Sequence, residues 1–135
     1  MTDIALRFAQ VTKSYGGVPA LSDFSLEVRR GAFFGLVGVN GAGKTTLIKC
    51  LLDCCDTDGG AIEIFDVRHR VTAARARLAY LPERFNPPFY LTGRDFVRYM
   101  LELYHTPFDE NRVARLFGAL DLDRSALDRP ARAYS

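Results

Sequence analysis

The sequence predicts an α/β fold that follows an antiparallel β layer and leads into a group of helices. Residues 32–37 form a continuous apolar run without alternation, which is typical of a strand in the centre of a parallel sheet. A glycine-rich segment, residues 38–46, follows directly, and residues 45–52 then have the pattern of a buried helix. Before this unit the chain alternates between apolar and polar residues, and after residue 91 it changes to helical spacing.

The predicted β layer comes first in the chain. Residues 4–8 and residues 21–28 alternate as half-buried strands do, and Phe24, Leu26 and Val28 share one face of the second. A turn around residues 13–17 separates them. The two segments therefore predict an antiparallel layer.

Further elements are expected behind the glycine-rich segment. Residues 61–65 read as a short strand, residues 71–77 as one or two helical turns, and residues 78–81 as a second core strand. Residues 82–91 read as a loop, because Pro87 and Pro88 within it fix φ and remove hydrogen-bond donors.

Two helices are predicted near the end of the chain. Thr92 and Asp95 have the spacing of a capping box, and the apolar residues behind them repeat at helical intervals. A second helix is expected to begin near Asp109. Both apolar stripes are interpreted as packing surfaces.

Composition excludes several classes of function. The net charge of +2 comes from 18 basic and 16 acidic residues without a basic block, so no direct nucleic-acid partner is expected. Cys50, Cys54 and Cys55 lack the spacing of a zinc site or a disulfide framework, and reduced cytosolic thiols are expected. His69 and His105 have no partnered motif and are expected at surface or half-buried positions.

The glycine-rich segment spells G-x-x-x-x-G-K-[ST] between a predicted strand and a predicted helix, which is the pattern of a nucleotide phosphate loop. Its backbone N–H groups and the helix N-terminus suit an anion. Lys44 supplies a charge for the β and γ phosphates, Thr45 a hydroxyl for Mg²⁺, and Thr46 a hydrogen bond on the α-phosphate side. The predicted phosphate-binding residues are Gly38, Asn40, Gly41, Ala42, Gly43, Lys44, Thr45 and Thr46.

Residues 38–46 also fit the narrower pattern G-x-[NS]-G-[AS]-G-K-[ST]-T, and here the chain resembles the nucleotide-binding domain of ATP-binding-cassette (ABC) transporters. The resemblance covers nearly the whole chain. It implies a P-loop NTPase fold with a RecA-like parallel core, an ATP-binding core at residues 1–90 and the start of a helical subdomain at residues 91–135. Residues 13–16, K-S-Y-G, resemble the family's aromatic loop, which makes Tyr15 the platform for adenine. Plain surface or core filling is the alternative for Tyr15.

Residues 78–83, L-A-Y-L-P-E, resemble the strand that leads into the family's Q-loop, with Glu83 where glutamine is usual. Glutamate keeps acceptors for Mg²⁺ but has no amide donor. The resemblance makes Lys44 and Glu83 the catalytic candidates and Thr45 and Glu83 the metal-ligand candidates, and it favours an exporter-like subtype. A solvated loop carboxylate is the alternative for Glu83.

The resemblance also implies partners. ATP and Mg²⁺ are the expected ligands, a second nucleotide-binding domain would face this one head to tail, and a transmembrane permease would hold it at the cytoplasmic membrane surface. Substrate, transport direction and the identity of the permease cannot be read from these residues. A non-transport ABC-type ATPase and a nucleotide-binding module that does not hydrolyse ATP are the alternative functions.

The family's signature motif would begin at Ser135, the last residue of the sequence. Because hydrolysis needs water-orienting groups beyond the phosphate loop, we expect residues 1–135 alone not to turn over ATP. Lys44-dependent hydrolysis by this polypeptide would contradict that expectation. Residues 32–37 would also expose an apolar edge in the isolated chain, so we expect it to be unstable or prone to aggregation.

Overall fold

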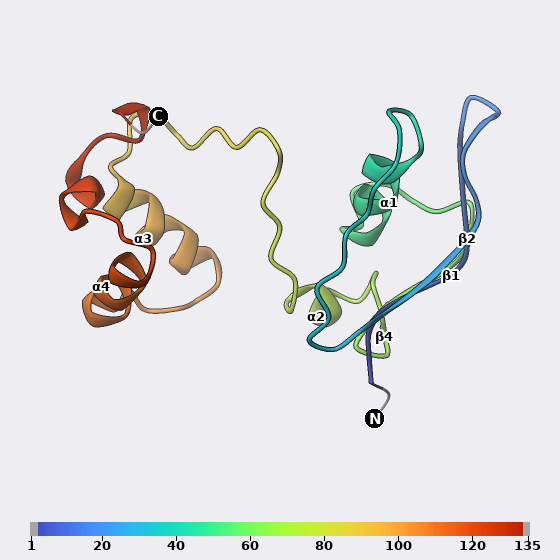
Figure 1. Ribbon diagram of the computed structural model, residues 1–135, viewed down its shortest axis with the longest axis horizontal. Coiled ribbons are helices and arrows are strands. Elements are labelled where there is room, and N and C mark those ends of the chain that lie inside the picture. Colours follow the sequence, from blue (N-terminus) through green and yellow to red (C-terminus); the bar gives the residue numbers. More distant parts are fainter. Residues whose placement is uncertain (1–2, 134–135) are drawn as a thin grey trace. The chain divides into compact units, whose positions relative to one another are not determined.

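A computed structural model describes residues 3–133 of the protein, so the expected start of the signature motif at Ser135 lies outside the described residues. The chain forms two compact units, residues 1–80 and 81–135 (Figure 1). Each unit is described by itself below. The proposed boundary between residues 90 and 91 falls ten residues later than this division, because the loop of residues 82–91 groups with the helices that follow.

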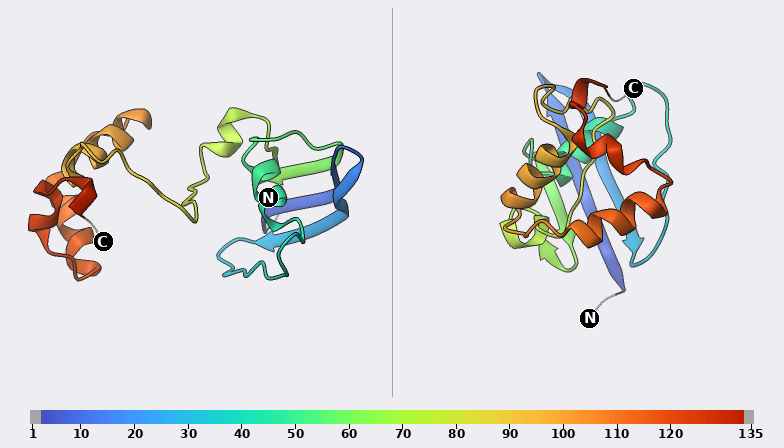
Figure 2. Two further views of the ribbon diagram at one scale, coloured as in Figure 1. Left: turned by 90° about the horizontal axis from the view of Figure 1, so that it is seen from above. Right: turned by 90° about the vertical axis from the view of Figure 1, so that its left-hand side faces the viewer.

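The first unit is built on an antiparallel sheet with the strand order β2-β1-β3-β4. Its strands are β1 (Ile4–Tyr15), β2 (Val18–Arg29), β3 (Gly59–Ile64) and β4 (Val67–Arg68). β1 pairs with β2 through a hairpin and with β3 on its other side (Figure 2). The predicted antiparallel layer is confirmed, and its first two strands are longer than the alternating segments indicated.

Helix α1 (Lys44–Leu51) packs on this sheet, and the short helix α2 (Thr72–Arg75) follows β4. Apolar residues of β1, β2 and β3 meet Leu47 and Cys50 of α1 in one cluster. Its buried members are Phe8, Val11, Leu21, Leu47, Cys50 and Ile62. The helix predicted at residues 45–52 is confirmed, and it is buried on one face only, at Leu47 and Cys50.

Two predicted core strands are not formed among residues 3–133, so the prediction of these two strands is wrong. Residues 32–37 and 78–81 have no regular structure, and Val37 is 93% exposed. A strand exists only through hydrogen bonds to a neighbour, and no described residue pairs with either segment. Both segments are apolar enough for a buried strand, but most of their side chains are exposed to solvent.

The second unit is helical. It contains α3 (Gly93–Leu103), α4 (Glu110–Ala119) and the 3-10 turns η1 (Arg124–Asp128) and η2 (Ala131–Ala133). Thr92 and Asp95 form the predicted capping box at α3, and the Asp109 side chain accepts two backbone N–H bonds at the start of α4. Arg94 joins these elements, since its guanidinium contacts Glu110 on α4 and, at 2.9 Å, Asp128 on η1. Within residues 3–133, no helix combines the length and apolarity needed to cross a membrane.

His69 is buried rather than at the surface or half-buried, so the expectation for this residue is wrong. The residue is 4% exposed, and Nδ1 of its ring lies 3.2 Å from the Ile62 carbonyl oxygen. Nε2 has no hydrogen-bond partner among the described residues, and the nearest carboxylate oxygen, on Asp53, is 3.9 Å away. Burial is the main cause that lowers the pKa of His69 below its usual 6.5.

This burial makes the stability of the first unit depend on pH. When the folded pKa lies below the unfolded value of 6.5, the unfolded chain binds more protons, so the free energy of unfolding falls as the pH drops below 6.5. We expect this fall in urea titrations at pH 5 to 7, and we expect His69→Asn to reduce it. His105→Asn, at an exposed position, is the control and should retain it. An identical pH profile in all three proteins would contradict the assignment.

Candidate functional site

The predicted phosphate loop leads directly into α1 and turns on two glycines. Gly41 and Gly43 have φ of 83° and 84°, in the left-handed region that L side chains rarely adopt. The Ala42 N–H donates to the Val39 carbonyl over 3.2 Å, and the Leu47 N–H donates to the Gly43 carbonyl over 2.8 Å. Gly43 is therefore both the last residue of the loop and the N-cap of the helix.

Gly43 also lies directly against the backbone of β2. A Cβ at this position would sit 2.4 Å from the Ala20 carbonyl oxygen and 3.0 Å from Leu21 Cδ2. Only a residue without a side chain can approach this closely, so the start of α1 is fixed against the sheet.

The Lys44 side chain folds back onto the loop. Its Nζ donates to the carbonyl oxygens of Gly38 and Val39, over 2.5 and 2.7 Å respectively. A Cβ at Gly38 would come within 4.0 Å of this Nζ. The ammonium group therefore lies against the start of the loop, where two backbone carbonyl oxygens accept its hydrogen bonds.

The N-terminus of α1 offers an anion further favourable groups. Its first turn contains no acidic residue, so no carboxylate of the helix opposes a phosphate at its positive end. The Thr45 side chain is exposed and that of Thr46 is half-buried. The lysine and the helix N–H groups are suited to bind a phosphate group. The hydroxyl oxygens are suited to bind a Mg²⁺ ion that accompanies ATP phosphates.

Tyr15 is brought to the same end of the first unit. It is the last residue of β1, it is 49% exposed, and its hydroxyl lies 3.7 Å from the Cys55 Sγ. The pKa of the phenol is raised, first by the hydrogen bond with Cys55 and then by burial, while a hydrogen bond with Thr46 acts in the opposite direction. Tyr15 therefore contacts the helix that follows the loop and still presents an open ring.

Asp58 holds the end of β1 that carries Tyr15, and the sequence interpretation missed this role. Its carboxylate accepts from Lys13 Nζ over 3.0 Å and from the Ser14 N–H over 2.6 Å. These bonds, with the one from Lys13 first, lower the pKa of Asp58. The partners are more than forty residues apart in sequence, so no local spacing could have revealed them.

Glu83 belongs to the second unit, and its side chain is exposed. The site that the structure assembles consists of first-unit residues, and a role of Glu83 beside the loop stays a prediction. Among residues 3–133, no three or more His, Cys, Asp or Glu side chains gather into a metal-binding group. A Mg²⁺ site through Thr45 and Glu83 likewise stays a prediction.

Comparison with known families gives a match between residues 21–134 and the family model described as "ABC transporter". The matched residues include the whole phosphate loop, α1 and nearly all of the second unit.

Curated relatives match shorter stretches. The chain is 52% identical over 62 residues to the ribose import ATP-binding protein RbsA 2 of Burkholderia cenocepacia, which is 46% of this chain and 12% of that protein. It is 40% identical over 85 residues to the Nod factor export ATP-binding protein I of Bradyrhizobium diazoefficiens, which is 62% of this chain and 28% of that protein. The chain thus spans far less than two thirds of these relatives.

Solved structures agree with the fold. An ATP-binding subunit of an ABC transporter superposes with a TM-score of 0.81 at 27% identity, over 97% of this chain and 56% of that one. A putative ABC transporter ATP-binding protein of Pyrococcus furiosus gives the same TM-score at 22% identity, over 96% and 62%. The predicted fold class, an α/β P-loop NTPase with an antiparallel β layer and the start of a helical subdomain, is confirmed.

The contact between Gly43 and β2 predicts a large cost for Gly43→Ala. A left-handed alanine costs about 1–2 kcal/mol, and the overlap with the Ala20 carbonyl adds about 1–3 kcal/mol. We therefore expect the free energy of unfolding, measured in urea, to fall by about 2–5 kcal/mol. Gly31→Ala is the matched control, because Gly31 has φ of 70° with no atom near its Cβ position. Equal losses for the two variants would show that the close contact with β2 contributes nothing.

Proposed function

The chain belongs to the ABC transporter family, and from this membership we propose that it binds Mg-ATP as the ATP-binding part of a transporter ATPase subunit. The observation that carries the proposal is the position of Lys44. Its Nζ is held against the start of the loop by the Gly38 and Val39 carbonyls, and the first turn of the helix that Lys44 begins contains no carboxylate. A phosphate that enters the loop would take the place of these carbonyls as the partner of the lysine.

The residues around Lys44 would each bind a different part of Mg-ATP. Backbone N–H groups of the loop and the α1 N-terminus would bind the phosphate oxygens, Thr45 would ligate Mg²⁺, and Thr46 would bind the α-phosphate side. Tyr15 would stack on adenine, which its half-exposed ring permits. Bound Mg²⁺ would supply charge neutralisation between the β and γ phosphates.

Coupling to transport is the wider part of the proposal. Glu83 would act near the γ-phosphate and in the link to a permease. Residues 1–90 would form the ATP-binding core, and a helical subdomain would start at residue 91. A second nucleotide-binding domain and a transmembrane permease would complete the working protein, at the cytoplasmic surface of the membrane. The exporter-like subtype rests on Glu83 alone, since the relatives include proteins named for ribose import and for Nod factor export.

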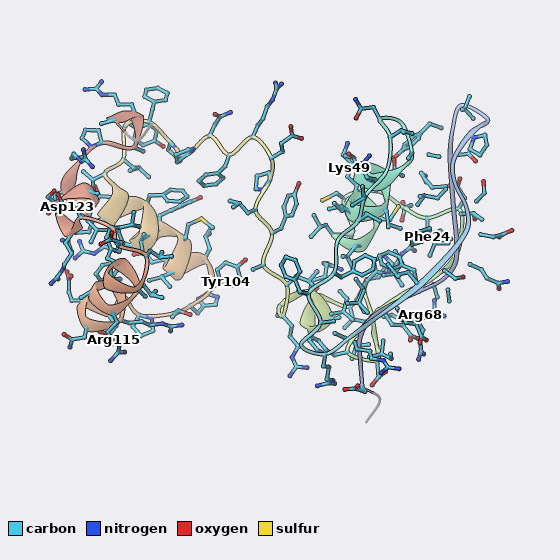
Figure 3. The ribbon with its side chains drawn as sticks, viewed as in Figure 1. Phe24, Lys49, Arg68, Tyr104, Arg115 and Asp123 are labelled. Atoms are coloured by element: carbon cyan, nitrogen blue, oxygen red, sulfur yellow. The ribbon has the colours of Figure 1, made fainter. Side chains whose placement is uncertain are left out.

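Removal of the Lys44 charge tests the proposal. Charge-assisted contacts are worth about 1.5–3 kcal/mol, so Lys44→Ala should weaken Mg-ATP binding by about tenfold or more in isothermal titration calorimetry. Lys49→Ala is the matched control, because Lys49 lies on the same helix with an exposed side chain outside the loop (Figure 3). Equal affinity of wild type and Lys44→Ala would refute the phosphate-loop assignment.

The role of Tyr15 has a separate test. Stacking of a base on an aromatic ring is worth about 1–3 kcal/mol, so Tyr15→Ala should weaken ATP binding by about tenfold or more, while Tyr15→Phe, which keeps the ring and loses the hydroxyl, should weaken it only about threefold. Inorganic tripolyphosphate has no base and should bind all three proteins alike. An alanine variant that binds ATP as wild type does would remove Tyr15 from the site.

A further inference from the structure

We propose that Cys50 and Cys55 form a reversible disulfide with oxidised glutathione as the oxidant, and that this modification weakens the adenine side of the nucleotide site. The first part rests on the geometry of the two thiols. The second part rests on the proposed function, because it invokes Tyr15 as the support for adenine.

The turn after α1 brings the two thiols together. Asp53 has φ of 60°, its N–H donates to the Cys50 carbonyl, and the Cys54 N–H donates to the Lys49 carbonyl over 2.9 Å. These bonds fold the chain back over the last turn of the helix. The Cys55 Sγ thus lies 3.5 Å from the Cys50 Sγ.

The two cysteines differ in access to solvent. Cys50 is fully buried in the apolar cluster, whereas Cys55 is half-buried at its edge. Burial and the hydrogen bond with Cys55 raise the pKa of Cys50 to about 12, so Cys50 is a thiol at neutral pH. Cys55 is therefore the residue that meets an oxidant, and Cys50 is the residue that resolves the product.

The reaction balances as two thiol–disulfide exchanges. The Cys55 thiolate attacks one sulfur of oxidised glutathione, forms a mixed disulfide and releases one glutathione thiolate. The Cys50 thiol then loses its proton, and its thiolate attacks the Cys55 sulfur of the mixed disulfide. The second glutathione leaves as a thiolate, which takes up a proton. Two cysteine thiols are oxidised, and one glutathione disulfide is reduced to two thiols.

Formation of this bond changes the surroundings of Tyr15. The two sulfurs must close from 3.5 Å to about 2.05 Å, and Cys50 is fixed in the core, so Cys55 makes most of the movement. The contact between the Tyr15 hydroxyl and the Cys55 Sγ is already long at 3.7 Å and would be lost. Tyr15 would then lose the thiol partner that, with Thr46, positions its phenol.

Cys54 provides an internal control, because it is an exposed thiol next to Cys55 that the turn does not direct toward Cys50. Its Sγ lies 3.9 Å from the Leu52 carbonyl oxygen. An oxidant that acted by exposure alone would modify Cys54 first.

Peptide mapping tests the disulfide. The reduced protein is incubated with oxidised glutathione, free thiols are alkylated, and linked peptides are identified by mass spectrometry before and after dithiothreitol. We expect a reversible Cys50–Cys55 link in wild type and in Cys54→Ser, and none in Cys50→Ser or Cys55→Ser. Glutathione retained on Cys54, with no link between Cys50 and Cys55, would overturn the proposal.

ATP titration of the mapped samples tests the coupling. Loss of one hydrogen bond at Tyr15 should weaken ATP binding about threefold in the oxidised protein, while tripolyphosphate binding should not change. Tyr15→Phe lacks the hydroxyl, so its affinity should not respond to oxidation. Equal ATP affinity of reduced and oxidised wild type would overturn the coupling. A reduced protein that binds no ATP would instead refute the proposed function, and the disulfide would still be judged by mapping.

Discussion

The close approach of Gly43 to β2 is the constraint on which the rest of the site depends. At φ of 84° and with no side chain, Gly43 lets α1 begin directly against the Ala20 carbonyl. This contact sets the position of the next residue, Lys44, whose Nζ reaches back into the loop to the Gly38 and Val39 carbonyls. The antiparallel layer therefore provides the surface against which the proposed phosphate loop is built.

The same layer positions the other candidate residues of the first unit. Tyr15 ends β1, Asp58 ties this end to the segment before β3, and Cys55 lies between Tyr15 and the buried Cys50. Changes at the thiols can therefore reach the aromatic ring without passing through the phosphate loop. The proposed phosphate contacts and the proposed base contact therefore involve largely different residues, and Thr46 is common to both.

Sequence reasoning succeeded where structure is decided by neighbouring residues. The capping box at Thr92, the helix start at Asp109 and the helix that follows the glycine-rich segment are set by residues a few positions apart, and all of these local structures are formed. It failed at residues 32–37 and 78–81, because a strand needs a partner that composition cannot supply. It also missed the burial of His69 and the bonds of Asp58, which follow from tertiary contacts rather than spacing.

The central claim, that residues 38–46 hold the phosphates of ATP around Lys44, is tested most directly by following backbone amides in NMR spectra as Mg-ATP is added. We expect the largest shifts at the amides of residues 38–46 and smaller shifts around Tyr15. Saturable binding that leaves these amides unchanged, with its largest shifts elsewhere in the chain, would contradict it.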